Sequence, residues 1–218
     1  MQLPFTETEF FDVLAAYNRV LWPAALALWV VSLAAVLLFI RGGNRAHRAL
    51  CALLAAHWAW SAIAYHAAFF TRINPAGWLF AALFLTQAWL LVWFGIVHGR
   101  LRFSIGRSAR HILAALLIAY SFAYPILNFA LGLEYPRIPL FAVPCPTTIF
   151  TAGLLLVAER PPGSLLVVPV VWSLIASSAT VLFDVRADFM LLPAALLLVA
   201  FTIADQTARF HHYRVAHD

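Results

Sequence analysis

A Pro-Cys-Pro-Thr-Thr run at positions 144–148 carries the most distinctive chemistry of the sequence, because it sets a thiol inside an apolar stretch. A cysteine sulfur is a soft ligand that suits Cu(I), Zn(II) or Hg(II). The flanking prolines remove two backbone donors, so we expect Cys145 at a proline-broken helix start that faces the interior. His66 is the second candidate metal ligand. In the alternative, structural interpretation, Cys145 is a small buried residue, and Thr147 and Thr148 bond to backbone carbonyls that the prolines free.

Three further apolar stretches carry polar residues at helical spacing, so each set shares one face of a helix. The sets are His57, Ser61 and Tyr65, with His66 beside them, then Tyr120, Tyr124 and Asn128, and finally Ser173, Ser177, Thr180 and Asp184. Because the hydrocarbon core of a membrane holds no water, such faces turn towards protein or a wet cavity. Hydrogen bonding between helices accounts for the serines and threonines. Ionisable residues within a membrane are rare and usually functional.

Together these residues predict a ligand cavity that opens towards the outer face of a membrane. The candidate residues of its outer half come from four helices and are His66, Asn128, Cys145, Thr147, Thr148 and Asp184. Tyr124 belongs to the same set of ligand-binding candidates, while His57 and Gln87 lie deeper and could form the floor. Asp184 has a second interpretation, an ion pair with Arg186 at the end of its helix, where acidic residues are tolerated.

Seven apolar stretches, each about long enough to cross a bilayer, must position these residues. They cover positions 18–40, 50–70, 75–97, 112–131, 144–158, 164–183 and 189–208. A spanning helix needs about 20 mostly apolar residues, and continuous rather than alternating apolar runs predict helices instead of a barrel. The fifth stretch is the shortest and predicts a short tilted helix or one entered through a proline-broken turn. We therefore predict an all-α integral membrane bundle of seven transmembrane helices, forming a single domain over 1–218.

The composition agrees with this class. Hydrophobic residues make up 64% of the chain and charged residues 11%, and the mean hydropathy of +0.89 lies far outside the soluble globular range. The net charge of +5 sits in short loops, which favours a role in membrane orientation over nucleic-acid binding. The two cysteines, Cys51 and Cys145, lie on different predicted helices and form no disulfide framework.

The arginines predict the orientation of the bundle. If the N-terminus lies outside, the inner segments hold ten of the fourteen basic residues, namely Arg41, Arg45, Arg48, Arg100, Arg102, Arg107, Arg110, Arg160, Arg209 and Arg214. The outer segments hold most of the acidic residues, namely Glu7, Glu9, Asp12, Glu134, Asp184 and Asp188. The positive-inside rule then predicts N-out and C-in. Positions 209–218 would form a cytoplasmic tail in which His211, His212 and His217 are solvated.

The sequence near the N-terminus predicts a helix that starts near Glu7. Thr6 and Glu9 have the spacing of a capping box, and a phenylalanine stands at each position of a hydrophobic staple. Positions 1–17 are predicted to form an amphipathic helix in the membrane interface, either as an anchor or as a lid over a cavity. This helix either runs into the first span or breaks near Pro23.

Several functional classes are excluded or disfavoured. The chain contains no lysine, so it cannot form a Schiff base with retinal. It shows no nucleophile elbow, HExxH, P-loop or Rossmann glycine pattern. His57 and His66 point in different directions from one helix and cannot clamp one haem together, so a haem would need His98 or His111 from the basic inner loop.

We therefore expect a transporter, channel or receptor-like protein with an outward-facing polar cavity for a metal ion or a small polar solute, rather than an enzyme. Its cofactor, if any, would be a soft transition metal, and its surroundings the lipid bilayer, with no nucleic acid. The alternatives are a membrane-bound haem or redox protein and a structural membrane subunit without its own ligand. The sequence leaves the oligomeric state open.

Three segments also carry a resemblance. The N-terminal run from Leu3 to Pro23, the tripeptide Tyr135-Pro136-Arg137, and the run from Pro144 to Thr151 resemble a family of uncharacterised bacterial multi-spanning membrane proteins. The resemblance covers the whole chain. It implies a multi-pass protein of the bacterial inner (plasma) membrane and brings no established activity.

The predicted orientation can be tested with reporter fusions. A C-terminal reporter joined at Arg107 or at Asp218 should be active in the cytoplasm, because both positions follow an odd number of predicted crossings from an outer N-terminus. Paired reporters that fold only on one side of the membrane provide the measurement. A periplasmic signal at either position would contradict the orientation.

Overall fold

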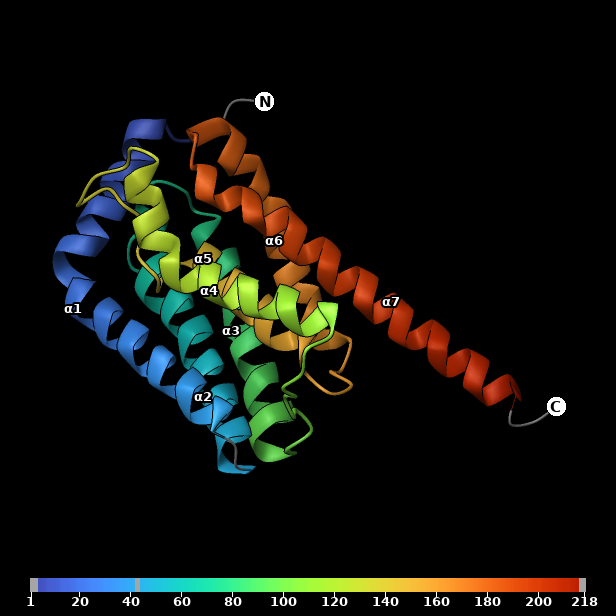
Figure 1. The fold of residues 1–218 in the computed structure, drawn as a ribbon. Helices are drawn as coiled ribbons and strands as arrows, with labels where there is room; N and C mark the ends of the chain where they lie inside the picture. The colour runs from blue at the N-terminus through green and yellow to red at the C-terminus, as the bar shows by residue number, and fades with distance from the viewer. Residues whose placement is uncertain (1–3, 42–43, 216–218) are drawn as a thin grey trace.

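The computed structural model describes residues 4–41 and 44–215, without the side chains of residues 44, 179, 181 and 208–215. Within these residues the chain folds into a strand-free bundle of seven α-helices (Figure 1): α1 (Glu7–Ile40), α2 (Asn44–Trp60), α3 (Gly77–Leu91), α4 (Ala109–Ala130), α5 (Pro144–Leu156), α6 (Ser164–Phe183) and α7 (Leu191–Val215). Two π-helical turns, η1 (Ser61–Ala67) and η3 (Val92–Val97), extend α2 and α3. Two short 3₁₀ helices, η2 (Phe70–Arg72) and η4 (Arg186–Met190), precede α3 and α7. The prediction of an all-α bundle is confirmed.

Four helical segments of the described chain are long and apolar enough to cross a membrane, namely Glu7–Ile40, Gly77–Val97, Ala109–Ala130 and Arg186–Thr207. They correspond to the first, third, fourth and seventh predicted stretches. α6 coincides with the predicted stretch 164–183, and α2 with η1 covers the second stretch as far as position 67. Large apolar side chains point outwards from the bundle, as at Leu79 and Ile126, each 69% exposed. Such outer faces are those of helices suited to lipid.

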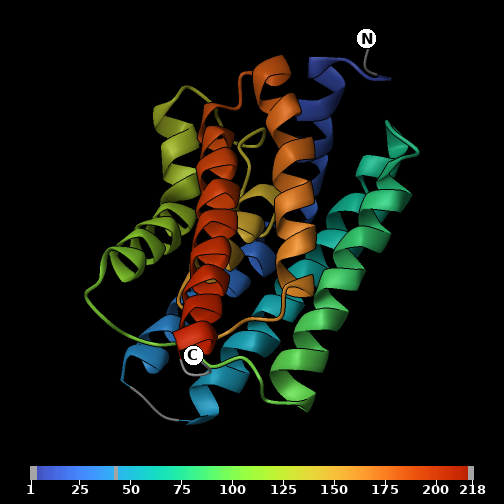
Figure 2. The same ribbon diagram turned by 90° about the vertical axis from the view of Figure 1, so that its right-hand side faces the viewer.

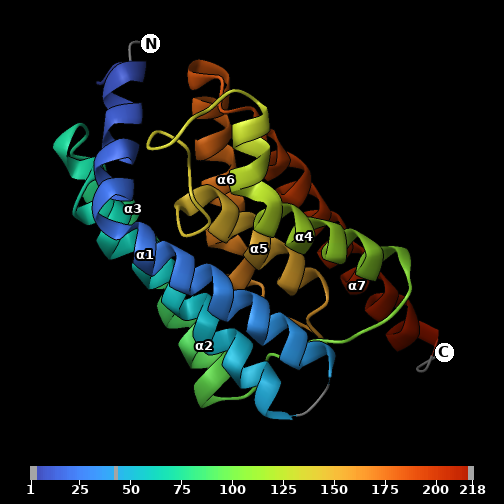
Figure 3. The same ribbon diagram turned by 60° about the vertical axis from the view of Figure 1, so that its left-hand side comes forward.

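The fifth predicted stretch, 144–158, is helical only as far as Leu156. α5 has 13 residues and is therefore about 20 Å long, too short for a hydrocarbon core of about 30 Å. Nearly all of its residues are buried, and it contacts α2, α4, α6 and α7. The segment before it enters the bundle without helical structure, with Phe141 and Val143 buried (Figure 3). Irregular backbone at this depth is tolerated where protein surrounds it.

The first helix is continuous from Glu7 to Ile40, so the segment up to position 17 is not a separate helix. The predicted capping box is confirmed, because the Thr6 hydroxyl accepts from the Glu9 backbone N–H and the Glu9 side chain accepts from the Thr6 backbone N–H. Pro23 lies within the helix without ending it. Residues such as Tyr17, fully buried, turn this first part towards the bundle.

The start of α1 and the end of α7 lie at opposite ends of the bundle (Figure 2). α7 remains helical to Val215, so most of the predicted tail 209–218 continues this helix. The side chains of His211 and His212 are not described, and His217 lies outside the described residues. At the same end as the close of α7, Phe103 forms an isolated antiparallel bridge with Ala158, which ties the loop after η3 to the end of α5.

Close packing between α2 and η3 depends on one glycine. A Cβ atom added to Gly95 would lie 2.5 Å from both Cβ and Sγ of Cys51. Cys51 is fully buried. No rotation of the small cysteine side chain can move its Cβ, so the two helical segments would have to separate.

Replacing Gly95 by alanine should therefore destabilise the protein by about 1–3 kcal/mol, the usual cost of overpacking. The matched control is Gly163→Ala, because nothing lies within 4 Å of a Cβ added there, and it should change stability by less than about 0.5 kcal/mol. Thermal unfolding in detergent measures both. Equal stability of the two variants would contradict the close contact, whereas adding Cys51→Gly to Gly95→Ala should restore part of the loss.

Candidate functional site

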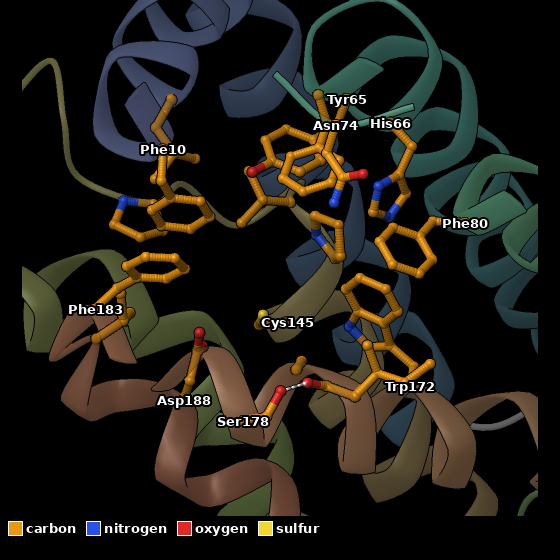
Figure 4. A pocket seen from close by; sticks show the side chains of 18 of the residues that line it. Phe10, Tyr65, His66, Asn74, Phe80, Cys145, Trp172, Ser178, Phe183 and Asp188 are labelled. Carbon is orange, nitrogen blue, oxygen red and sulfur yellow. Dashed lines mark hydrogen bonds between the residues drawn. The ribbon is translucent and has the colours of Figure 1, made fainter. Parts of the chain in front are cut away.

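A cavity of about 150 Å³ lies inside the bundle near the end where α1 begins (Figure 4). Residues from α1, α3, α4, α5 and α6, together with η1, η2 and η4, form its walls. These walls are mainly aromatic, with side chains from Phe5, Phe10, Phe70, Phe80, Trp172 and Phe183. A mainly apolar cavity with a few converging polar groups is typical of small-molecule sites.

His66 is the most unusual polar residue of this cavity. Its side chain is 1% exposed, and among the described residues neither Nδ1 nor Nε2 has a hydrogen-bond partner. Its ring centroid lies 4.8 Å from that of Phe84 and 5.0 Å from that of Trp172. A neutral imidazole carries one donor and one acceptor, and leaving a buried polar group unpaired costs roughly 1–3 kcal/mol. A buried group that carries this cost is a candidate for contact with a ligand.

The π-helical turn η1 places His66. A π turn holds about one more residue than an α turn, so the side chains that follow it face about one position away from the α-helical register. An unbroken α-helix would put Tyr65 in line with His57, with His66 to one side. In the structure Tyr65 and His66 both line the cavity. Single π turns occur frequently at functional sites.

Asp188, Tyr124 and Cys145 form a second polar group in the cavity wall. The Tyr124 hydroxyl donates to Oδ1 of Asp188, and the Cys145 thiol interacts with the same carboxylate. Asp188 is 6% exposed, and its carboxylate points into the cavity beside the sulfur (Figure 4). The Tyr120 hydroxyl, one turn before Tyr124, donates to the backbone carbonyl of Ala187 at 2.8 Å. α4 thus fixes η4 in the position that directs Asp188 inwards.

Cys145 lies at the start of α5 and lines the cavity, as expected. The helix is not broken there, because Pro144 and Pro146 fall in its first turn, where the missing N–H groups would have had no helical partner. The Thr148 hydroxyl donates to the carbonyl of Pro144 at 2.9 Å. This bond agrees with the structural interpretation of the threonine.

Trp172 of α6 adds a donor to the cavity. The indole Nε1 is buried and lacks a hydrogen-bond partner by geometry among the described residues, although the Cys145 thiol is near enough to interact with it. Figure 4 shows the indole beside His66 and across from Asp188. Two unpartnered polar side chains, His66 and Trp172, therefore face the same small space.

The N-terminal residues close the cavity at the end of the bundle. The Phe10 ring stacks on that of Phe183 with centroids 4.8 Å apart, and the Phe5 ring meets that of Phe70 edge-on at 5.5 Å. Phe5 and Phe10 also contact each other at 6.4 Å, as the predicted hydrophobic staple requires. Phe5 and Phe10 thus form part of the wall of the cavity.

Several predicted ligand-binding residues do not line this cavity. The Asn128 amide donates to the carbonyl of Tyr124 in its own helix at 3.0 Å. Thr147 is fully buried and lies 3.5 Å from the Ser61 hydroxyl. Thr148 is likewise buried within α5.

The two residues predicted to form the floor of the cavity, His57 and Gln87, bond to neighbouring helices instead. His57 Nε2 pairs with the Ser32 hydroxyl at 2.7 Å, which joins α2 to α1. Gln87 donates to the backbone carbonyl of Leu165 at 3.0 Å, which joins α3 to α6. Neither His57 nor Gln87 lines the cavity.

Asp184 forms the surface ion pair that was the second interpretation of this residue. Its carboxylate lies 2.9 Å from the guanidinium of Arg186, and both side chains are exposed. The hydrogen bonds from Arg186 lower the pKa of the Asp184 carboxyl below its ordinary value. The acid that reaches the cavity is Asp188, four residues later.

A metal site at Cys145 and His66 lacks ligands. Both residues line the cavity, but the described residues contain no cluster of three or more His, Cys, Asp or Glu side chains that could hold a metal ion. Structural zinc usually takes four protein ligands, and catalytic zinc takes three. The expectation of a soft metal ion bound here is therefore not supported.

Sequence reasoning missed Asp188, Trp172 and the phenylalanines of the cavity wall. Asp188 precedes the last apolar stretch, so in the sequence it counted only as one of the acidic residues that indicate the membrane orientation. Trp172 lies among apolar residues, as an ordinary core aromatic residue does. The available signal was that Asp184 and Asp188 are four residues apart at a helix end, which allows one of them to turn inwards. The phenylalanines give no signal of their own.

The comparisons with known proteins place the chain in a family without adding a function. No curated protein and no solved structure matches the chain. Residues 7–212 match DUF6064, a family of unknown function, which confirms the resemblance to an uncharacterised family. The match runs from the first turn of α1 into the last part of α7. The chain therefore belongs to the DUF6064 family.

Proposed function

We propose that this protein is a multi-pass protein of the bacterial inner membrane that binds a small, mainly apolar molecule in the cavity around His66, as a transporter or receptor-like protein. The observation that carries the proposal is His66 itself. It is a fully buried imidazole with two unpaired nitrogens that faces a cavity. Such a residue destabilises the folded state unless a ligand supplies the missing hydrogen bonds.

The size and lining of the cavity favour a ligand of about one ring. A cavity of about 150 Å³ accommodates a molecule the size of benzene. The aromatic walls suit an apolar body, and His66 and Trp172 offer hydrogen bonds at one side. The expected ligand is therefore a molecule of about one ring with a hydrogen-bonding group, in place of the metal ion or small polar solute that the sequence suggested.

The surface of α6 supports access to this cavity from the side of the bundle. Ile175 and Leu182 line the cavity and are also 39% and 55% exposed. Both belong to α6, so the cavity reaches an apolar outer face of the bundle. A mainly apolar ligand that partitions into the bilayer could enter by this route.

The distribution of arginines supports the proposed N-out, C-in orientation. Arg45, Arg48 and Arg102 surround one hollow at the end of the bundle opposite the cavity, and Arg100 and Arg160 contribute to a second. Positive charge concentrates on the cytoplasmic side of membrane proteins. The cavity would accordingly lie in the outer half of the membrane.

Filling the cavity should abolish binding. Ala176 is buried and lines the cavity, so Ala176→Phe places a ring where the ligand would lie. Benzyl alcohol is the probe, titrated by calorimetry in detergent against protein-free micelles. The control is Ala200→Phe on the exposed side of α7, which should leave binding unchanged. Benzyl alcohol bound equally by the two variants would refute the proposal.

Replacing His66 by phenylalanine should weaken binding and stabilise the fold. The ring keeps most of the volume, while two unpaired buried polar atoms disappear, so stability should rise by about 1–3 kcal/mol. The matched control His57→Phe should destabilise, because it breaks the 2.7 Å bond to Ser32. Thermal unfolding and calorimetry with benzyl alcohol measure both effects. A His66→Phe protein that is less stable than the native one would assign His66 a structural role.

A further inference from the structure

Asp188 is a buried carboxylate without a cationic partner among the described residues. Its side chain is 6% exposed, and no ion pair to it is found there. The nearest arginine in sequence, Arg186, is turned to the surface and pairs with Asp184. The hydrogen bond from Tyr124 and the contact with Cys145 bring neutral groups to the carboxylate, not positive charge.

Burial of an unpaired carboxylate is costly, and ionisable groups at membrane depth generally have a partner. Among the described side chains none in the wall of this cavity supplies a positive charge, since no arginine lines it there and the chain has no lysine. An anionic ligand would face Asp188 without compensation. A cationic ligand would supply the missing charge.

The aromatic walls favour the same sign of charge. The face of an aromatic ring carries negative potential, and several rings around a cation form the usual site for organic ammonium groups. Phe10 and Phe183 stack at one side of the cavity, and Phe80 and Trp172 lie 5.3 Å apart at another. The carboxylate of Asp188 lies between these two pairs of rings and points into the cavity (Figure 4).

We infer that the ligand of this cavity is an organic cation, a protonated amine carried on a small apolar body, with Asp188 as its counter-ion. This inference rests on the proposed function, because it requires that the cavity binds a ligand. The ammonium group donates to Asp188, and the acceptor nitrogen of His66 takes a second N–H when the ligand spans the cavity. The apolar body lies against the rings of Phe80 and Trp172.

The test compares two probes of nearly the same shape. Benzylamine is protonated at neutral pH, and benzyl alcohol is neutral. Calorimetry in detergent should show that the native protein binds benzylamine at least about tenfold more tightly than benzyl alcohol, because only the ammonium pairs with the buried carboxylate. Equal affinities would overturn the inference and leave the proposed function standing. Binding of neither probe would overturn both.

A pair of variants locates the effect. Asp188→Asn removes the charge and keeps an acceptor for the Tyr124 hydroxyl, so it should lose the preference for benzylamine while its affinity for benzyl alcohol stays within about twofold. The control is the same substitution at the exposed acid four residues earlier, Asp184→Asn, which should keep the preference. An unchanged preference in Asp188→Asn would overturn the assignment of the counter-ion. The comparison of the two probes on native protein holds even if this variant does not fold.

Discussion

The burial of α5 is the constraint on which the rest of the bundle depends. A 13-residue apolar helix contacts α2, α4, α6 and α7, and nearly all of its residues are buried. The cavity lies at its first turn, where Cys145 and the irregular segment before the helix contribute to the wall. Pro144 and Pro146 fall in this turn, where a missing N–H costs no helical hydrogen bond. Cys145 lies between them and lines the cavity.

Hydrogen bonds elsewhere in the bundle show how unusual this cavity is. Asn18 donates to two backbone carbonyls of the segment before α5, each at 2.7 Å, and Trp58 donates to Thr151 at 2.8 Å. His57 keeps one hydrogen bond even though its second nitrogen is unpaired. Gln87 and Asn128 likewise keep one hydrogen bond although a second atom of each is buried and unpaired. His66 and Trp172 differ from these residues, because among the described residues no polar atom of either side chain has a hydrogen-bond partner.

The sequence predicts the helices where length and hydropathy agree, and α6 matches the expected 164–183 at both ends. For the fifth stretch it left two forms open, a short tilted helix or a helix entered through a proline-broken turn, because a short apolar run does not distinguish a crossing from a buried central helix. It gave Asp184 two interpretations, a cavity residue or an ion-pair partner of Arg186, and treated Asp188 only as a charge of an outer segment. Asp184 ends α6 in a left-handed conformation, with φ of 50°, and is exposed, whereas Val185 and Asp188 after it are buried. No pattern of residue types in the sequence predicts this left-handed conformation.

Residue contacts across helices are the other part that the sequence does not contain. One tyrosine from each of the polar faces of the second and fourth stretches, Tyr65 and Tyr124, lines the cavity. The pattern of residue types does not say which helices adjoin, so it could not assign Trp172 and the wall phenylalanines to one site. Cys145 was found because proline at a helix start is a local signal.

The π turn η1, which follows α2, makes the orientation of His66 depend on the number of residues in that turn. His66 faces the cavity because the turn from Ser61 to Ala67 holds an added residue, and the added residue need not itself touch a ligand. A relative that differs by one deletion in this turn could retain every side chain of the site and still direct its imidazole elsewhere. Within such a lineage, gain or loss of the site would be recorded as an insertion or a deletion instead of a substitution.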